Sequence, residues 1–189
     1  MPPKVRITKE EIVRVGVELV RKDGPAALNA RSVAAALNCS TQPVFSNFAT
    51  MEELQKAVDA AAYEYYLVFL QREAERGEYP TYKAFGMAYI RFAKEESELF
   101  KFLFMCDRKG EERKPTVDFE ASVEMIMKSN GIGRDQAEMM HLEMWACVHG
   151  IAAMLVTSFL TLQWDLISKM LSDVYHGVRM IYAPEEGRG

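Results

Sequence analysis

The sequence has few of the residues that build disulfide or metal sites. Its 189 residues include three cysteines and three histidines. Cys39, Cys106 and Cys147 are widely separated and odd in number, so they match neither a zinc-ligand pattern nor a framework of paired disulfides. Unpaired thiols suit a reducing compartment, and we therefore expect a cytoplasmic protein.

The chain also lacks a membrane-spanning run, a secretion signal and an excess of basic residues. No uncharged apolar stretch reaches the length needed to cross a bilayer, and the N-terminus lacks the layout of a signal peptide. The net charge of −4 argues against a generally basic protein that coats nucleic acid. Hydrophobic residues make up 49% of the sequence, which is enough for a core and predicts a soluble protein.

Motifs of catalysis are missing as well. The sequence has no phosphate-binding glycine loop and no nucleophile at a useful spacing from a base. Glu138 and His141 lie three residues apart, a spacing that can bind a metal on a helix, but two ligands make an unconvincing site. The sequence therefore predicts no enzyme, no metal and no cofactor.

Helical periodicity covers nearly the whole chain, and no alternating pattern indicates a strand. Thr8 with Glu11 and Thr50 with Glu53 form capping boxes, which mark the starts of two helices. The first of these helices is expected to stop at Asp23. The later helices are predicted over about 50–77, 82–94, 97–106, 117–130, 135–162 and 164–182.

Residues 29–48, NARSVAAALNCSTQPVFSNF, predict two short helices joined by a tight turn. Asn29 is a suitable helix cap, and Asn38 tolerates the left-handed backbone that ends a helix. Ser40 is predicted to cap the second helix, with Pro43 in its first turn, where a missing N–H costs little. Such a pair places the start of its second helix against base edges in the major groove of DNA.

The side chains expected to contact DNA lie on this second helix and around it. Gln42 can pair with adenine through its amide, and Thr41 and Val44 can contact a thymine methyl group. Arg31 is predicted to contact a phosphate or a guanine, with a structural salt bridge as the alternative. The complete predicted DNA-binding set is Lys4, Arg6, Arg31, Ser40, Thr41, Gln42, Pro43, Val44, Phe45, Asn47 and Lys56.

A capped first helix, a helix-turn-helix, a capped long helix and an all-helical body together resemble the TetR family of bacterial transcriptional regulators. The N-terminal resemblance is carried by Ile12–Gly24, Arg31, Ala34, Ser40 and Phe45–Leu54. In the C-terminal part, residues 98–104 (ELFKFLF) and 145–150 (WACVHG) resemble a subgroup with a Trp-x-x-x-His-Gly element. The resemblance implies a homodimer with a four-helix interface and a mid-domain pocket for a small effector.

The sequence departs from that family at two positions. Phe45 stands where the family usually has a tyrosine, and Met51 stands where a lysine often opens the next helix. Both usual residues contact phosphates, so their replacement is expected to reduce the backbone contribution to affinity. Phe45 and Phe48 are assigned mainly to packing, with Phe45 also able to touch a sugar.

An effector pocket and a dimer interface are predicted in the C-terminal part. Methionines offer adaptable apolar walls for a pocket. The predicted effector-binding residues are Phe102, Met105, Met125, Trp145 and His149. The last two predicted helices are apolar on more than one face, which calls for a partner. The predicted interface residues are Met154, Leu155, Phe159, Leu162, Trp164, Met170, Val174 and Val178.

The predicted fold class is all-α, with about nine helices in two domains. Residues 1–49 are expected to form a three-helix DNA-binding domain, and residues 50–189 a helical bundle for effector binding and dimerisation. The predicted function is that of a dimeric, sequence-specific transcriptional regulator, a repressor released from a palindromic operator by a small, largely apolar effector. The alternative is a helical small-molecule-binding protein of the same fold with weak or lost DNA binding.

Overall fold

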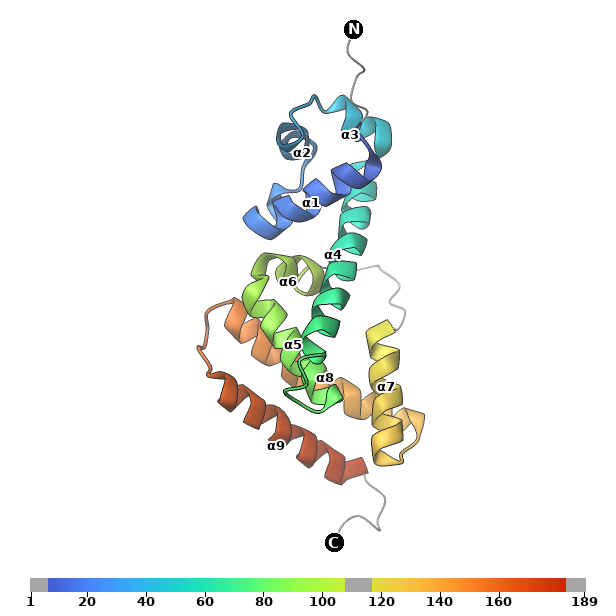
Figure 1. Cartoon of the computed structure of the whole chain (residues 1–189), viewed down its shortest axis with the longest axis vertical. Helices are drawn as coiled ribbons and strands as arrows, with labels where there is room; N and C mark the ends of the chain where they lie inside the picture. The colour runs from blue at the N-terminus through green and yellow to red at the C-terminus, as the bar shows by residue number, and fades with distance from the viewer. Residues whose placement is uncertain (1–6, 108–116, 183–189) are drawn as a thin grey trace. The chain divides into compact units, whose positions relative to one another are not determined.

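The computed structural model describes residues 7–107 and 117–182 of the chain. All regular structure in these two ranges is helical, which confirms the predicted all-α class (Figure 1). The described elements are α1 (Lys9–Asp23), η1 (Pro25–Ala27, a 3-10 turn), α2 (Ala30–Ala36), α3 (Gln42–Asn47), α4 (Met51–Ala74), α5 (Thr81–Glu95), α6 (Ser97–Phe104), α7 (Val117–Asn130), α8 (Arg134–Val156) and α9 (Trp164–Tyr182).

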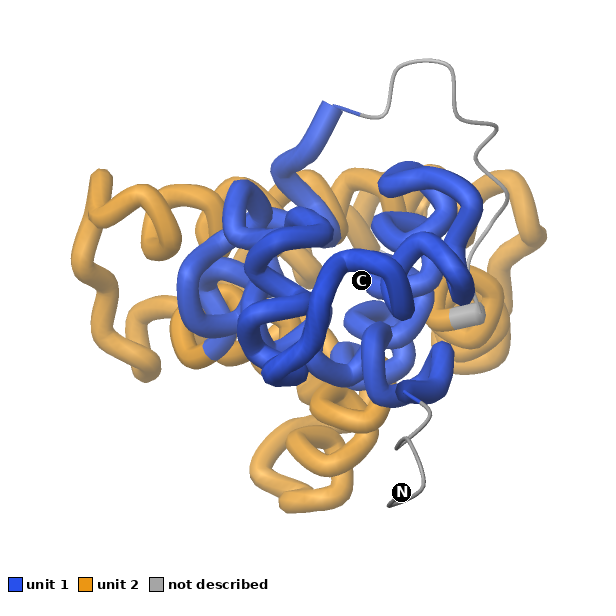
Figure 2. Tube along the Cα trace, turned by 90° about the horizontal axis from the view of Figure 1, so that it is seen from above, with its two compact units in different colours: residues 1–66, 96–107 blue, residues 67–95, 108–189 orange. Residues whose placement is uncertain are grey.

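The chain divides into two compact units, which Figure 2 distinguishes by colour. Unit 1 contains the described residues up to Tyr66 together with 96–107, and unit 2 contains 67–95 and the described residues from 117 onward. The division therefore falls within α4. Helix α6 packs on α1, so a helix that follows α5 in the sequence belongs to the N-terminal unit.

Local hydrogen bonds fix the starts of α1 and α4 in unit 1. The Thr8 hydroxyl accepts the Glu11 N–H at 3.2 Å and the Glu11 carboxylate accepts the Thr8 N–H at 2.9 Å, which confirms this capping box. The Thr50 hydroxyl likewise accepts the Glu53 N–H at 3.2 Å. The Glu53 carboxylate, however, accepts the Ala49 N–H at 2.9 Å, so the second box is closed one residue earlier than predicted.

A close approach between α1 and α4 holds unit 1 together. A Cβ atom at Gly16 would lie 2.6 Å from Cγ2 of Val58 and 3.2 Å from Cδ1 of Leu28, so no larger residue fits without displacing its neighbours. The core around this contact draws on all four of the first helices. Its fully buried members include Ile12, Val20, Val33, Val44, Phe48, Leu54 and Val58.

Helix α8 is the central helix of unit 2, and α5, α7 and α9 all pack against it. It buries Met140, Met144 and Val148 on its inner side. By length and composition α8 could cross a membrane, a weak criterion that core helices of soluble proteins also meet. Packing against its three neighbours buries only part of this helix, since 28% of the apolar window that meets the criterion is buried.

Helix α8 is also where a predicted helix end is wrong. The helix was expected to continue to Leu162, but it ends at Val156. Ser158 adopts a left-handed backbone with φ of 56°, and the Thr157 hydroxyl donates to the Ala153 carbonyl at 2.7 Å. Neither glycine nor proline marks this end, so the sequence carried no strong stop signal there.

Candidate nucleic-acid interface

The turn between α2 and α3 forms as the sequence predicts. The Asn29 side chain accepts the Ser32 N–H at 3.0 Å and caps α2. Asn38 adopts a left-handed backbone with φ of 51°, and the Cys39 N–H donates to the Ala34 carbonyl at 2.9 Å. The chain thus reverses within a few residues and α3 begins immediately afterwards.

The predicted cap of α3 is wrong. The helix begins at Gln42, Thr41 is the capping residue, and no side chain caps it. With Ser40 as the cap, Pro43 would stand at the third helical position, where it has no N–H to donate, and the Phe45 N–H instead donates to the Thr41 carbonyl at 3.2 Å. Ser40 is left as an exposed residue of the turn, and Pro43 lies in the first helical turn as expected.

Burial divides α3 into an inner and an outer side. Val44 is only 1% exposed and packs inward with Phe48, so the predicted contact between Val44 and a thymine methyl is wrong. The sequence could not assign this face because a helix of six residues is too short to show periodicity. The exposed residues of α3 are Gln42, Phe45 and Ser46. Ser46 was missed as a candidate, and the exposure of Phe45 corrects its assignment to packing.

Asn47 has a structural role that the sequence did not indicate. Its side-chain amide donates to the Pro43 carbonyl at 2.8 Å and to the Ile7 carbonyl at 3.4 Å. These bonds tie the backbone that precedes α1 to the last turn of α3. A DNA contact by Asn47 remains a prediction.

Only some of the residues predicted to contact phosphates lie in the described part of the chain. Arg31 lies exposed on α2, and Lys56 lies exposed on α4. Lys4 and Arg6 lie outside the described residues. Thr41, the capping residue of α3, and Pro43, in its first turn, are half-buried. Unit 1 thus presents Arg31 and Lys56 as exposed cations from the predicted set.

A buried carboxylate joins three helices of unit 1. Glu96, at the start of α6, is 8% exposed and accepts two hydrogen bonds from Arg21 of α1, Nε–Oε2 at 2.7 Å and Nη2–Oε1 at 2.5 Å. The Tyr65 hydroxyl of α4 donates to the same carboxylate at 2.8 Å. The Glu96 carboxylate raises the pKa of the Arg21 guanidinium further. This group fixes α6 against α1 and α4 within unit 1.

Replacing Glu96 by alanine is expected to lower the free energy of unfolding by about 2 kcal/mol. Removing the carboxylate leaves Arg21 and Tyr65 without this hydrogen-bond partner. Because Arg21 is partly solvated, water compensates for part of the lost stability. Urea titration followed by circular dichroism measures the effect. Asp173→Ala, which breaks the exposed Lys169–Asp173 pair, is the control and should change stability by less than about 0.5 kcal/mol. Equal losses in both variants would contradict a special role for Glu96.

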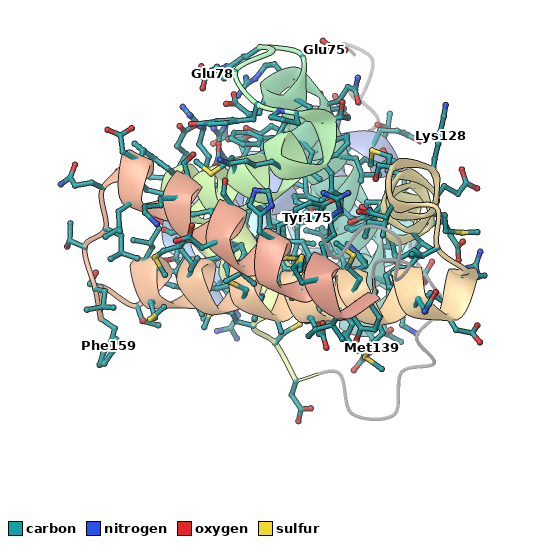
Figure 3. The ribbon with its side chains drawn as sticks, turned by 90° about the horizontal axis from the view of Figure 1, so that it is seen from below. Glu75, Glu78, Lys128, Met139, Phe159 and Tyr175 are labelled. Carbon is teal, nitrogen blue, oxygen red and sulfur yellow. The ribbon has the colours of Figure 1, made fainter. Side chains whose placement is uncertain are left out.

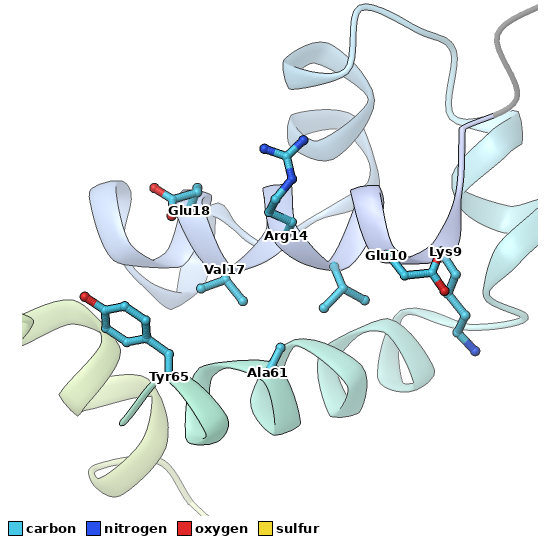
Figure 4. A pocket seen from close by; sticks show the side chains of 8 residues that line it. Lys9, Glu10, Arg14, Val17, Glu18, Ala61 and Tyr65 are labelled. Carbon is cyan, nitrogen blue, oxygen red and sulfur yellow. The ribbon is translucent and has the colours of Figure 1, made fainter. Parts of the chain in front are cut away.

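An open groove of about 500 Å³ lies between α1 and α4 in unit 1 (Figure 4). Val17 and Ala61 contribute apolar surface to it, and Tyr65 lies at one end. Its charged residues are Lys9, Glu10, Arg14 and Glu18, whose charges cancel. None of the predicted effector-binding residues lines this groove.

The predicted effector-binding residues do not form one pocket within either unit. Phe102 is buried in α6 and Met105 is exposed just after it, so both belong to unit 1. Met125 of α7 and Trp145 and His149 of α8 belong to unit 2. The packing of α6 on α1 causes this separation, and no local sequence pattern predicts that packing.

Two tyrosine–histidine pairs connect α5 with α8 in unit 2. The Tyr82 hydroxyl lies 2.9 Å from Nδ1 of His141, and the Tyr89 hydroxyl lies 2.9 Å from Nδ1 of His149. Burial raises the pKa of both tyrosines and lowers the pKa of both histidines. The His149 ring also stacks on Trp145, with centroids 4.9 Å apart. Polar groups are therefore concentrated where α5 and α8 meet.

Acidification is expected to destabilise unit 2 through these histidines. Because burial holds the pKa of His141 and His149 below the ordinary value of about 6.5, the unfolded chain binds protons more readily. Their contribution to stability is present above pH 6.5 and is lost as the pH falls through the lowered folded pKa values. Melting temperatures of the double variant His141→Gln, His149→Gln should fall less between pH 7 and 5 than those of the wild type.

The third histidine provides the control for that measurement. His176 is exposed on α9, so His176→Gln should keep the pH dependence of the wild type. An unchanged pH dependence in the double variant would show that other groups cause the acid sensitivity.

Among the described residues, no group of three or more His, Cys, Asp or Glu side chains is placed to hold a metal ion.

One comparison to known families covers the sequence from α5 to the first part of α9. Residues 82–171 match the family model for the tetracyclin repressor-like C-terminal domain. This tetracyclin repressor-like segment begins in α5 and ends in α9, and it contains both tyrosine–histidine pairs. The Trp-x-x-x-His-Gly subgroup remains an expectation from the sequence.

A comparison with solved structures covers almost the whole chain. A protein of unknown function from Rhodococcus sp. RHA1 is similar with a TM-score of 0.71 and 18% sequence identity, covering 96% of this chain and 98% of that chain. At this identity the likeness concerns the fold. No curated protein matches the sequence.

The tetracyclin repressor-like segment and the rest of α9 expose an apolar surface on unit 2. Figure 3 shows Phe159 projecting from the α8–α9 connection and Met139 pointing outward from α8, whereas Tyr175 lies on the inner side of α9. The exposed large apolar side chains on α8, α9 and their connection are Met139, Leu142, Trp145, Phe159, Leu160, Leu166, Met180 and Ile181. Of the predicted dimer residues, only Phe159 is in this group.

The other predicted dimer residues are half-buried in the single chain. Val178 packs against the core cluster of α7 and α8, which favours a role inside the subunit. Trp164 lies under two cations of α5, with its ring centroid 5.1 Å from Arg91 Cζ and 5.1 Å from Lys94 Nζ. The remaining predicted residues are Met154, Leu155, Leu162, Met170 and Val174, all of intermediate exposure.

Proposed function

We propose that this protein is a dimeric, sequence-specific DNA-binding transcriptional regulator. The observation that carries the proposal is the division of α3, in which Val44 and Phe48 anchor the helix while Gln42, Phe45 and Ser46 face outward. A short helix that follows a tight turn and presents polar groups near its N-terminal end fits the reading helix of a helix-turn-helix. Arg31, exposed on α2, supplies a cation near this pair of helices.

Dimerisation is proposed through the apolar surface of α8 and α9. Exposed leucines and methionines on two packed helices, with Phe159 on their connection, form a surface that water solvates poorly. Two copies would present two reading helices, which fit successive major-groove faces when held about 34 to 36 Å apart. A palindromic operator follows from the two-fold symmetry of such a dimer.

Repression and its release by a small, largely apolar effector complete the proposal. The tetracyclin repressor-like segment supports it, since a helical body of that kind accompanies a DNA-reading head. An effector changes DNA affinity only if it binds two conformations unequally, with a coupling of about 1 to 3 kcal/mol in typical cases. Glu96 directly follows α5 in the chain and is hydrogen-bonded to Arg21 of α1, which offers a route for that coupling through the chain and this ion pair.

Selection of bound duplexes from a random pool tests the proposal. The full-length protein should enrich a palindrome whose half-sites are separated by about one helical turn. Unselected DNA at the same salt concentration serves as the reference, because phosphate contacts alone give binding without sequence preference. Enrichment of no sequence would contradict the proposed function.

The alternative function is a helical small-molecule-binding protein that retains the fold but binds DNA weakly or not at all. The observations that favour it are Phe45 and Met51 at positions where the resembled family has phosphate-contacting residues, and the net charge of −4. A thermal-shift screen combined with the duplex selection separates the two. Small molecules that raise the melting temperature, together with no selected duplex, would favour the alternative.

A further inference from the structure

Phe45 is a large apolar side chain that the fold leaves on the outside of α3. It is 51% exposed, although α3 is already anchored by the buried Val44 and Phe48. Among the described residues of unit 1, Met105 is the one other large apolar side chain with comparable exposure, and it lies after α6, away from α3 in the sequence. The packing of unit 1 therefore does not account for the position of this ring.

Phe45 shares its side of the helix with Gln42. The two residues are three apart in α3, so their side chains are neighbours on one helical face. Gln42 is exposed on that face and is suited to a bidentate pair with adenine. A ring next to it would lie over the adjoining base pair. The apolar group that a base edge offers in the major groove is the C5-methyl of thymine.

The surroundings of α3 leave apolar contact as an important source of discrimination. Arg31 is the one charged residue in the sequence from 29 to 50. Val44, for which the sequence predicted an apolar contact with DNA, is buried. Phe45 also lacks a hydroxyl, so its ring cannot donate a hydrogen bond to a phosphate oxygen.

We propose that the Phe45 ring reads the C5-methyl group of a thymine next to the base pair contacted by Gln42. This inference rests on the proposed DNA-binding function and deepens it. Each operator half-site accordingly contains a thymine whose methyl group is buried by Phe45 on binding. Burial of one methyl group corresponds to an affinity difference of about fourfold for each half-site.

The experiment replaces thymine by deoxyuridine, which removes the methyl group and leaves base pairing unchanged. Each thymine of the selected duplex is replaced in turn in both half-sites, and dissociation constants are measured for the full-length wild type and Phe45→Ala. Val68→Ala, which truncates an exposed apolar side chain of α4 in unit 2, is the matched control. Melting temperatures check folding, which the exposed ring is not expected to affect. Lower salt restores measurable binding to a weak variant.

The proposal expects one position per half-site at which deoxyuridine weakens binding by wild type and Val68→Ala by about fourfold per methyl and leaves binding by Phe45→Ala unaffected. Equal losses for wild type and Phe45→Ala would overturn it, since another residue would then read the methyl group. Insensitivity of the wild type at every thymine would overturn it as well, while leaving DNA binding established. Failure to select any duplex would instead reject the proposed function and this inference together.

Discussion

Replacing Leu142 on α8 or Leu166 on α9 by glutamate is expected to dissociate the proposed dimer and to weaken operator binding by two orders of magnitude or more. These leucines are 51% and 47% exposed in the single chain, so a partner subunit would bury them. An unpaired carboxylate at a buried interface costs about 3 to 5 kcal/mol, and every 1.4 kcal/mol is about a tenfold change in an equilibrium constant. Sedimentation velocity and operator titration measure the two effects.

Val68→Glu is the matched control for this prediction. Val68 is a large apolar residue of α4 in unit 2 with 69% exposure, so the same kind of change is made away from α8 and α9. The control should remain dimeric and bind the operator like the wild type. If Leu142→Glu and Leu166→Glu both remained dimers, the proposed interface would be in the wrong place.

Replacing Gln42 by alanine is expected to weaken operator binding by about ten- to a hundredfold for each half-site and to relax the preference at one base position. A bidentate contact between a glutamine amide and adenine contributes about 1 to 3 kcal/mol of discrimination. Gln42 is exposed on α3. Its backbone carbonyl accepts a hydrogen bond from the Ser46 hydroxyl at 2.8 Å, and this bond does not involve the Gln42 side chain. Repeating the duplex selection with the variant measures both effects.

Lys56→Ala distinguishes base reading from backbone attraction. Lys56 is exposed on α4, and a phosphate contact there would weaken binding to all sequences similarly and reduce the salt slope by about 1. Gln42→Ala should instead leave the salt slope unchanged. If Gln42→Ala weakened all sequences to the same extent, the residue would not read a base.

Features that depend on a few neighbouring residues could be predicted from the sequence. The Thr8–Glu11 box, the Asn29 cap and the left-handed Asn38 are all formed, because each depends on bonds within one turn of the chain. Helices with a clear pattern were also predicted closely, and α7 and α9 have the bounds that were expected. The all-α class follows from the same local signals.

Features that depend on which surfaces meet could not be predicted in the same way. Helix α3 is too short for its face to be read from periodicity, and only its packing shows that Val44 is buried and Phe45 exposed. The predicted effector-binding residues were chosen by chemistry along the sequence, and the packing of α6 on α1 divides them between the units. Leu142 and Leu166 emerged as interface candidates only from their exposure.

The sequence by itself thus determined that the chain is helical, where most helices begin, and that a tight turn separates α2 from α3. Those properties arise from backbone hydrogen bonds and capping groups a few residues apart. The tertiary structure alone decided which side of α3 faces outward, that Glu96 holds Arg21, and which apolar side chains of α8 and α9 stay exposed. These properties depend on contacts between residues distant in the chain, whose partners no local pattern specifies.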